Sequence, residues 1–228
     1  MNSNEPNLKS HLDDLRSSTG FPEGGLSSVI YCGKMRNEGD TTDTLGAHRD
    51  VVEAEVNSEG SNVTGLLIGQ GTSIMHFIEG PSQAVLRILG NLHNHKHFAT
   101  GKDGTSMQEG RVVYSVEDCP KRNFHEWYSG VLPEKKSQVD DLTAESCAEL
   151  VNGVALGLFD MGERLKTAAD DVDISTYADL LPGKAVILGL CSSPLFFSLA
   201  DYNKTYIEPF HLDLESERSW PLERMIIY

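Results

Sequence analysis

Hydrophobic and polar positions are most regular between residues 63 and 92. The stretch 63–81 contains two short apolar runs around a Gly-Gln-Gly-Thr centre, a pattern typical of a β-hairpin with a tight turn. Glu79-Gly80-Pro81 ends the second run, and proline is well suited to open a helix. The next apolar residues recur at three- and four-residue steps and predict an amphipathic helix: Ala84, Val85, Ile88, Leu89 and Leu92.

The elements predicted around this unit complete a βαββαβ order. Residues 26–32 predict a strand, 35–44 a polar loop, 45–56 a helix with Leu45, Val52 and Val56 on one side, and 108–116 another strand. This order predicts an α+β, ferredoxin-like sheet, and right-handed crossovers place both helices on one face. The groove between those helices is then the expected place for a planar ligand.

The remainder of the chain predicts a helical extension. Residues 143–165 predict a helix capped by Thr143, in which three glycines indicate either close packing or an interruption. Residues 174–181 predict a short helix, and 184–191 a buried strand or packed linker. We expect 138–181 to pack back on the sheet. The predicted organisation is therefore a polar arm (1–25), a domain (26–130), and a helical extension with a docking tail at 210–228 (131–228).

Charge narrows the choice of partners. With 34 acidic and 19 basic residues, the formal net charge of −15 argues against nucleic acid or an anionic membrane as the main partner. It favours solubility, or a basic surface on another protein. No apolar run approaches the roughly 20 residues that span a bilayer. Residues 1–23 lack the apolar core of a signal peptide, so a cytoplasmic location is expected.

The usual motifs of metal sites and enzymes are not found in the sequence. The cysteines are far apart without a Cys-x-x-Cys pair, which predicts buried free thiols. Three histidines at 93, 95 and 97 are spaced by two and cannot converge from one helix, so no metal site is expected. Neither a Gly-x-Ser-x-Gly nucleophile setting nor a phosphate-binding Gly-x-x-x-x-Gly-Lys-Ser/Thr motif occurs, and we expect no enzyme. The cysteines are Cys32, Cys119, Cys147 and Cys191.

Several segments together resemble the BLUF family of flavin-binding blue-light sensors. The resemblance covers about 26–130, and with a further C-terminal portion the chain is most similar to the testis-expressed BLUF-like proteins of animals. The matching segments are 29–31 (VIY), 63–67 (VTGLL), 77–81 (FIEGP) and 122–127 (RNFHEW).

The resemblance implies roles for five positions. In BLUF domains the flavin lies between the two helices, a tyrosine donates an electron and a proton to it, and a glutamine rearranges its hydrogen bonds. An asparagine holds the flavin, and a methionine near a tryptophan relays the signal. The tyrosine and the tryptophan match Tyr31 and Trp127, whereas the glutamine, asparagine and methionine positions fall at His76, Ser58 and Ser129.

These replacements change the expected chemistry. A carboxamide offers a donor and an acceptor on one group, whereas imidazole presents its two nitrogens on opposite sides of a ring. Serine is too short to replace asparagine. Each buried flavin polar group left without a partner costs about 1–3 kcal/mol, and two such losses weaken binding by roughly a hundredfold or more. The retained residues also have structural interpretations, since Tyr31 and His76 suit a core and Trp127 suits a loop anchor.

Two functions follow as expectations. The first is a non-enzymatic structural or interaction protein that binds no cofactor; the resemblance implies a flagellar or ciliary axonemal setting with other proteins as partners. The second is a flavin-binding blue-light sensor that carries FAD. An absorption spectrum of the purified protein distinguishes them, because a flavoprotein would be yellow.

Overall fold

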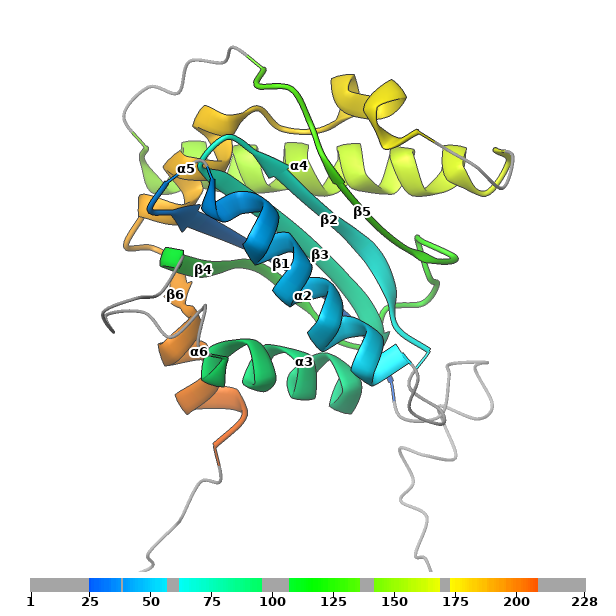
Figure 1. Ribbon diagram of the computed structural model, residues 1–228. Coiled ribbons are helices and arrows are strands. Elements are labelled where there is room, and N and C mark those ends of the chain that lie inside the picture. Colours follow the sequence, from blue (N-terminus) through cyan, green and yellow to red (C-terminus); the bar gives the residue numbers. More distant parts are fainter. Residues whose placement is uncertain are drawn as a thin grey trace, which may run out of the picture.

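A six-stranded β-sheet forms the centre of the computed structural model (Figure 1). The structure describes residues 25–37, 39–56, 62–95, 107–135, 142–168 and 173–208. The strands are β1 (Leu26–Met35), β2 (Thr64–Gln70), β3 (Ser73–Pro81), β4 (Met107–Val116), β5 (Trp127–Val131) and β6 (Phe197–Ser198).

The strand order is β5-β2-β3-β1-β4-β6. β1 lies antiparallel to both β3 and β4, β2 is antiparallel to β3, and β5 is parallel to β2. The order β2-β3-β1-β4, with one helix in each crossover, confirms the predicted ferredoxin-like α+β fold. The helices are α2 (Asp40–Val56), α3 (Ser82–Asn94), α4 (Ala144–Leu165), the 3₁₀ helix η1 (Ile174–Leu180), α5 (Lys184–Ser192) and α6 (Leu199–Tyr206).

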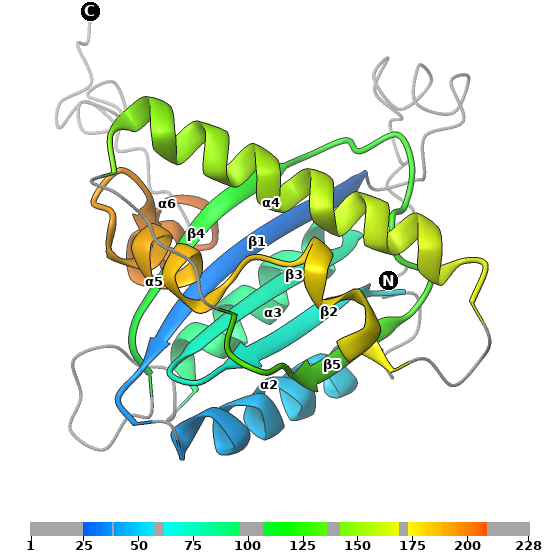
Figure 2. The same ribbon diagram turned by 90° about the horizontal axis from the view of Figure 1, so that it is seen from above.

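Helices cover both faces of the sheet. Figure 2 shows α4 and α5 on one side and α2 and α3 on the other. Successive residues of β1 therefore enter different cores: Val29 and Tyr31 pack with α2, α3 and α6, whereas Ile30 and Cys32 pack with α4, η1 and α5. Every residue of β2 is buried, as expected for a strand covered on both faces.

The C-terminal helices pack closely against the second face, as predicted for 138–181 within its described part. Thr143 caps α4 through a capping box, also as predicted. A β-carbon added at Gly157 would lie 2.2 Å from the carbonyl oxygen of Leu180, and one at Gly162 would lie 2.6 Å from that of Asn123. Glycine therefore permits close packing along an uninterrupted helix.

Several predictions for individual segments were wrong. Residues 184–191 form a helix whose buried residues are Ile187, Leu190 and Cys191; the sequence did not show this period because the run is apolar at nearly every position. The predicted loop 35–44 is shorter, since β1 extends to Met35 and α2 begins at Asp40. The elements β5, β6 and α6 were not predicted at all. The sheet draws strands from both 26–130 and 131–228, and the boundary between them stays a prediction.

The remaining predictions concern burial and the outer segments. All four cysteines are buried and free, which confirms that prediction. The arm before Gly25, Ser58 and the tail 210–228 lie outside the described residues. In the described part of the chain no single helix is long and apolar enough to cross a membrane. Taken together, η1 and α5 would be long and apolar enough, but they are bent by 65° relative to each other.

Candidate functional site

Three of the five candidate residues meet at one place in the sheet. Tyr31 and His76 are cross-strand partners on β1 and β3, and β5 brings Trp127 beside Gly65 at the start of β2. His76 Nδ1 lies 3.2 Å from the Tyr31 hydroxyl, and the Trp127 indole N–H donates to His76 Nε2 at 3.0 Å. His76 thus bridges the tyrosine and the tryptophan.

The indole partner fixes the protonation state of His76. A tryptophan Nε1–H only donates, so Nε2 of His76 must accept and the imidazole is neutral. Its proton is assigned to Nδ1, which donates to the Tyr31 oxygen. Both ring nitrogens of His76 are therefore engaged by protein groups.

A second imidazole, His48 of α2, completes the cluster. Its ring stacks on Tyr31 with centroids 5.6 Å apart, and it meets His76 edge-on at the same separation. His48 Nδ1 donates to the carbonyl oxygen of Thr44 at 2.7 Å. Sequence reasoning missed His48, although it lies three residues after Leu45 and four before Val52, on the apolar side of the predicted helix.

Burial keeps the cluster uncharged. Desolvation lowers the pKa of His76 well below its usual value, and the neighbouring His48 lowers it further. Desolvation also lowers the pKa of His48 to about 3, with the Thr44 bond opposing this and His95 adding to it. Burial, with a smaller effect of Cys32, raises the pKa of the Tyr31 phenol well above its usual value.

The other two candidate residues do not join this cluster. Ser129 follows Trp127 by two residues on β5, where its hydroxyl accepts a 2.7 Å hydrogen bond from Arg49 of α2. Ser58 lies outside the described residues. The structure therefore brings together the tyrosine, glutamine and tryptophan positions and leaves the methionine position tied to a helix.

An open groove lies between α2 and α3, where a ligand was expected. Its volume is about 390 Å³. Neither Tyr31 nor His76 lines it, and both are fully buried beneath the helices. The groove is lined by Asp50, Val51, Ala54, Asn91, Asn94 and His95.

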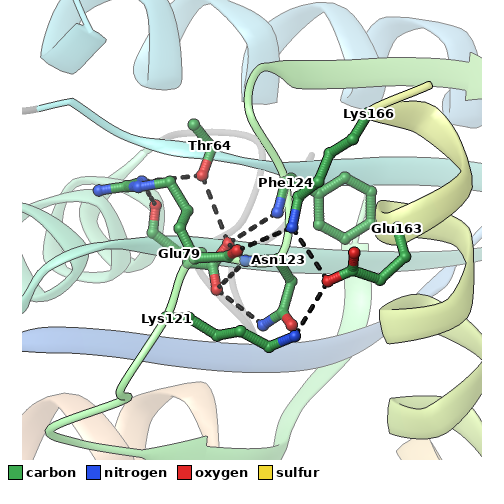
Figure 3. A network of polar contacts seen from close by, with 8 residues as sticks. Thr64, Glu79, Lys121, Asn123, Phe124, Glu163 and Lys166 are labelled. Carbon is green, nitrogen blue, oxygen red and sulfur yellow. Dashed lines mark hydrogen bonds and ion pairs between the residues drawn. The ribbon is translucent and has the colours of Figure 1, made fainter. Parts of the chain in front are cut away.

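A buried carboxylate at the end of β3 holds the segment that leads into β5. Glu79 accepts hydrogen bonds from the backbone N–H groups of Asn123 and Phe124 at 2.8 and 3.0 Å, and from the Asn123 amide at 2.8 Å (Figure 3). Arg122 donates to the Thr64 hydroxyl at 2.8 Å and to the Glu79 carbonyl oxygen at 3.3 Å. These bonds fix the chain immediately before Trp127.

The same segment is tied to α4 by exposed charges. Glu163 pairs with Lys121 and with Lys166, each at 3.0 Å, and Lys166 also donates to the Arg122 carbonyl oxygen at 3.3 Å (Figure 3). The sequence placed Glu79 and Asn123 in family motifs but gave no sign that they contact each other.

The strand order and the Tyr31–His76–Trp127 arrangement define a BLUF-like α+β protein. A model of the family described as testis-expressed protein 47 matches residues 25–208. Because this match covers most of the chain, the chain belongs to the testis-expressed protein 47 family.

Solved structures with a similar arrangement include BLUF proteins. BlrB in its dark state is 17% identical, covers 68% of this chain and 94% of its own, and has a TM-score of 0.36. BlrP1 of Klebsiella pneumoniae, in a calcium and cyclic-diGMP complex, is 13% identical, with coverages of 72% and 34% and a TM-score of 0.40. A bacterial light-regulated adenylyl cyclase is 11% identical, with coverages of 62% and 36% and a TM-score of 0.37. These likenesses are too distant to say anything about function.

A curated relative matches only a small part of its own length. The pentafunctional AROM polypeptide of Zygosaccharomyces rouxii is 30% identical over 119 residues, which is 52% of this chain. The chain spans about 6% of that protein. The activities in its name are therefore not carried over to this chain.

Replacing Glu79 with glutamine should destabilise the fold strongly. The amide retains one acceptor and turns two N–H donors toward the backbone donors of Asn123 and Phe124, so buried groups lose their partners. We expect the free energy of unfolding, measured in urea, to fall by about 2–4 kcal/mol. Glu163→Gln is the control, and because this carboxylate is exposed the urea midpoint should hardly change. Equal effects of the two changes would contradict this role for Glu79.

Acid should destabilise the protein through its buried histidines. A histidine of ordinary pKa gains a proton in the unfolded chain below about pH 6.5, whereas His48 stays neutral in the fold down to about pH 3. Stability is then fully present above pH 6.5 and falls with pH by about 1.4 kcal/mol per unit for this residue. His76 acts in the same direction.

Chemical unfolding between pH 5 and 6.5 measures this slope. His48→Phe should reduce it, because one group with a lowered pKa is removed, whereas exposed His125→Gln should leave it as in the wild type. A His48→Phe protein that keeps the full slope would show that His48 is already charged in the fold.

Proposed function

We propose that this protein is a non-enzymatic interaction protein, built on a BLUF-like domain that has lost flavin photochemistry and binds no cofactor. The observation that carries the proposal is the double engagement of His76, whose two nitrogens bond Tyr31 and Trp127. In BLUF domains, by the resemblance, a carboxamide at this position bridges tyrosine and flavin. Here an imidazole bridges tyrosine and tryptophan instead.

The filled surroundings of the tyrosine support this proposal. The His48 ring stacks on Tyr31 from the helix side, and the Tyr31 side chain is fully buried. A flavin would have to displace this ring and would find no donor or acceptor on His76. Its buried polar edge would lose about 1–3 kcal/mol for each group without a partner.

Two of the cysteines, Cys32 and Cys191, lie in environments that do not favour nucleophilic catalysis. Burial raises the pKa of the Cys191 thiol to about 12, with Glu109 adding to the effect, and raises that of Cys32 well above its usual value. A thiolate is the reactive form of cysteine, and these environments disfavour it. This supports a role in binding rather than in covalent chemistry.

An absorption spectrum of the purified chain tests the loss of flavin chemistry. We expect a colourless protein that acquires no flavin band after incubation with FAD and removal of unbound ligand, because His76 has no free bonding site. A bound flavin whose band shifts to the red on illumination would establish the alternative, a blue-light sensor. Flavin bound without a shift would contradict the loss of binding and leave only the loss of the photocycle.

We further propose that the protein is cytoplasmic and works in the sperm flagellum or ciliary axoneme, with other proteins as partners and neither nucleic acid nor membrane. The name of the family, which refers to testis, and the net charge of −15 support this setting. A tagged chain expressed in ciliated cells should remain with detergent-extracted axonemes, and deletion of residues 210–228 should release it. Complete extraction of the full chain by detergent would contradict the placement.

A further inference from the structure

Strand β5 has one bonded edge and one outward edge (Figure 2). Gly65 N–H donates to the Glu126 carbonyl, and Leu132 N–H donates to the Gly69 carbonyl. Alternate residues of a parallel strand bond the same neighbour, so Trp127, Ser129 and Val131 direct their N–H and C=O groups outward. Within the described residues these outward groups make no backbone hydrogen bond. Such an edge is a template for another strand.

A cation lies at the middle of this outward edge. Arg49 of α2 is exposed and donates to the hydroxyl of Ser129, the central residue of β5, at 2.7 Å. Among the ion pairs of the described residues none includes Arg49. In a chain with 34 acidic side chains, an exposed guanidinium over a strand edge favours a carboxylate brought by the incoming strand.

The chain itself contains a segment of matching pattern beyond the part that its family model covers. Residues 212–217 read Leu-Asp-Leu-Glu-Ser-Glu, and this segment lies outside the described residues. In an extended backbone successive side chains point to opposite faces. The acids at 213, 215 and 217 would then share one face, and the leucines at 212 and 214 the other.

We propose that the segment 212–217 of one copy adds as a strand to the outward edge of β5 in a second copy. Side chains alternate between two faces in both strands, and the faces of the added strand match those of β5. Trp127 points to the side of α2 and α3, where Ser129 meets Arg49, and Tyr128 points to the side of α4 and η1. Carboxylates of the added strand therefore face Arg49, and its leucines cover half-exposed Tyr128.

The geometry excludes the chain's own edge as the site. The described chain ends after α6, where Ile207 packs beside Gly90 of α3, and α3 in turn packs against α2. Two helix spacings, roughly 16–20 Å, separate α6 from α2. The four residues from Glu208 to Leu212 span at most roughly 14 Å. The segment therefore reaches an edge on another molecule.

The charge pattern also disfavours pairing of β5 with β5. A two-fold axis at Ser129 would bring the two Arg49 side chains together, and like charges across paired strands are destabilising. Binding of segment 212–217 of one copy to the β5 edge of another is a heterologous contact, because each copy contributes one surface of each kind. Such contacts build open chains unless the rotation closes a ring.

Sedimentation velocity of the full chain tests this inference, which rests on the proposed interaction role only in naming a second copy as one partner. The wild type should form species beyond the dimer as its concentration rises, and salt should weaken them. Ser129→Pro removes the central outward N–H, which a proline can replace on an edge strand, and should keep the protein monomeric. Ser129→Thr retains that N–H and is the control.

Charge reversals provide variants that do not depend on proline. Arg49→Glu should weaken association roughly tenfold or more, and the double change Asp213→Lys with Glu215→Lys should do the same from the tail side. A triple variant with Arg49→Glu as well as both lysines should recover part of the association, because each charge again meets its opposite.

Mixing the Ser129→Pro chain with the Asp213→Lys, Glu215→Lys chain (the tail variant) distinguishes this assembly from any symmetric one. The Ser129→Pro chain keeps its tail and the tail variant keeps its edge, so together they should form a one-to-one dimer that neither forms alone. A monomeric wild type, tail variants that assemble as the wild type does, or a mixture that stays monomeric would each overturn the inference. A β5–β5 dimer would appear as association lost with Ser129→Pro but retained with the tail variant. A monomer would leave the absorption test of the proposed function unaffected.

Discussion

The buried carboxylate of Glu79 fixes the geometry on which the site depends. It ends β3 inside the protein, where an ionised group needs several donors to remain. The backbone of Asn123 and Phe124 supplies them, so the segment before β5 is held at one position relative to β3. From there the chain continues beside β2 as β5, and Trp127 bonds His76. The Glu79 side chain thus links the end of β3 to the segment that leads into β5.

The cluster above β1 and β3 holds one imidazole between two fixed partners. His76 accepts from an indole and donates to a phenol, so it acts as a bridge inside a core. A carboxamide could turn and exchange its partners, whereas this imidazole has one nitrogen on each side and both are occupied. His48 stacks on Tyr31, and its lowered pKa keeps this part of the interior neutral.

The sequence predicted the parts of the fold that rest on local periodicity. The hairpin, α3 and the capped α4 follow from apolar spacing and from Thr143, and their order yields the ferredoxin-like topology. The short elements β5, β6 and α6 depend on tertiary partners and have no comparable local signal. Within the site, the sequence identified Tyr31, His76 and Trp127, but only the fold shows that the imidazole joins the other two.

His48 and Glu79 show which contacts could not be predicted from the sequence, and the reason is physical. Both are polar residues that the structure buries, and burial of a polar group depends on donors and acceptors that arrive from distant segments. A helical wheel could have placed His48 inward, but no pattern pairs Glu79 with a backbone 44 residues later. Contacts of this kind are decided by the assembled fold.

The two edges of the sheet differ in what covers them, and this decides where binding can occur. β6 passes directly into α6, and Tyr202 of that helix meets Ser115 of β4. β5 ends a sheet whose two faces are already packed, and Arg49 reaches over it to bond Ser129. Of the backbone in the described residues, the outward side of β5 offers hydrogen-bonding groups already aligned for an extended segment.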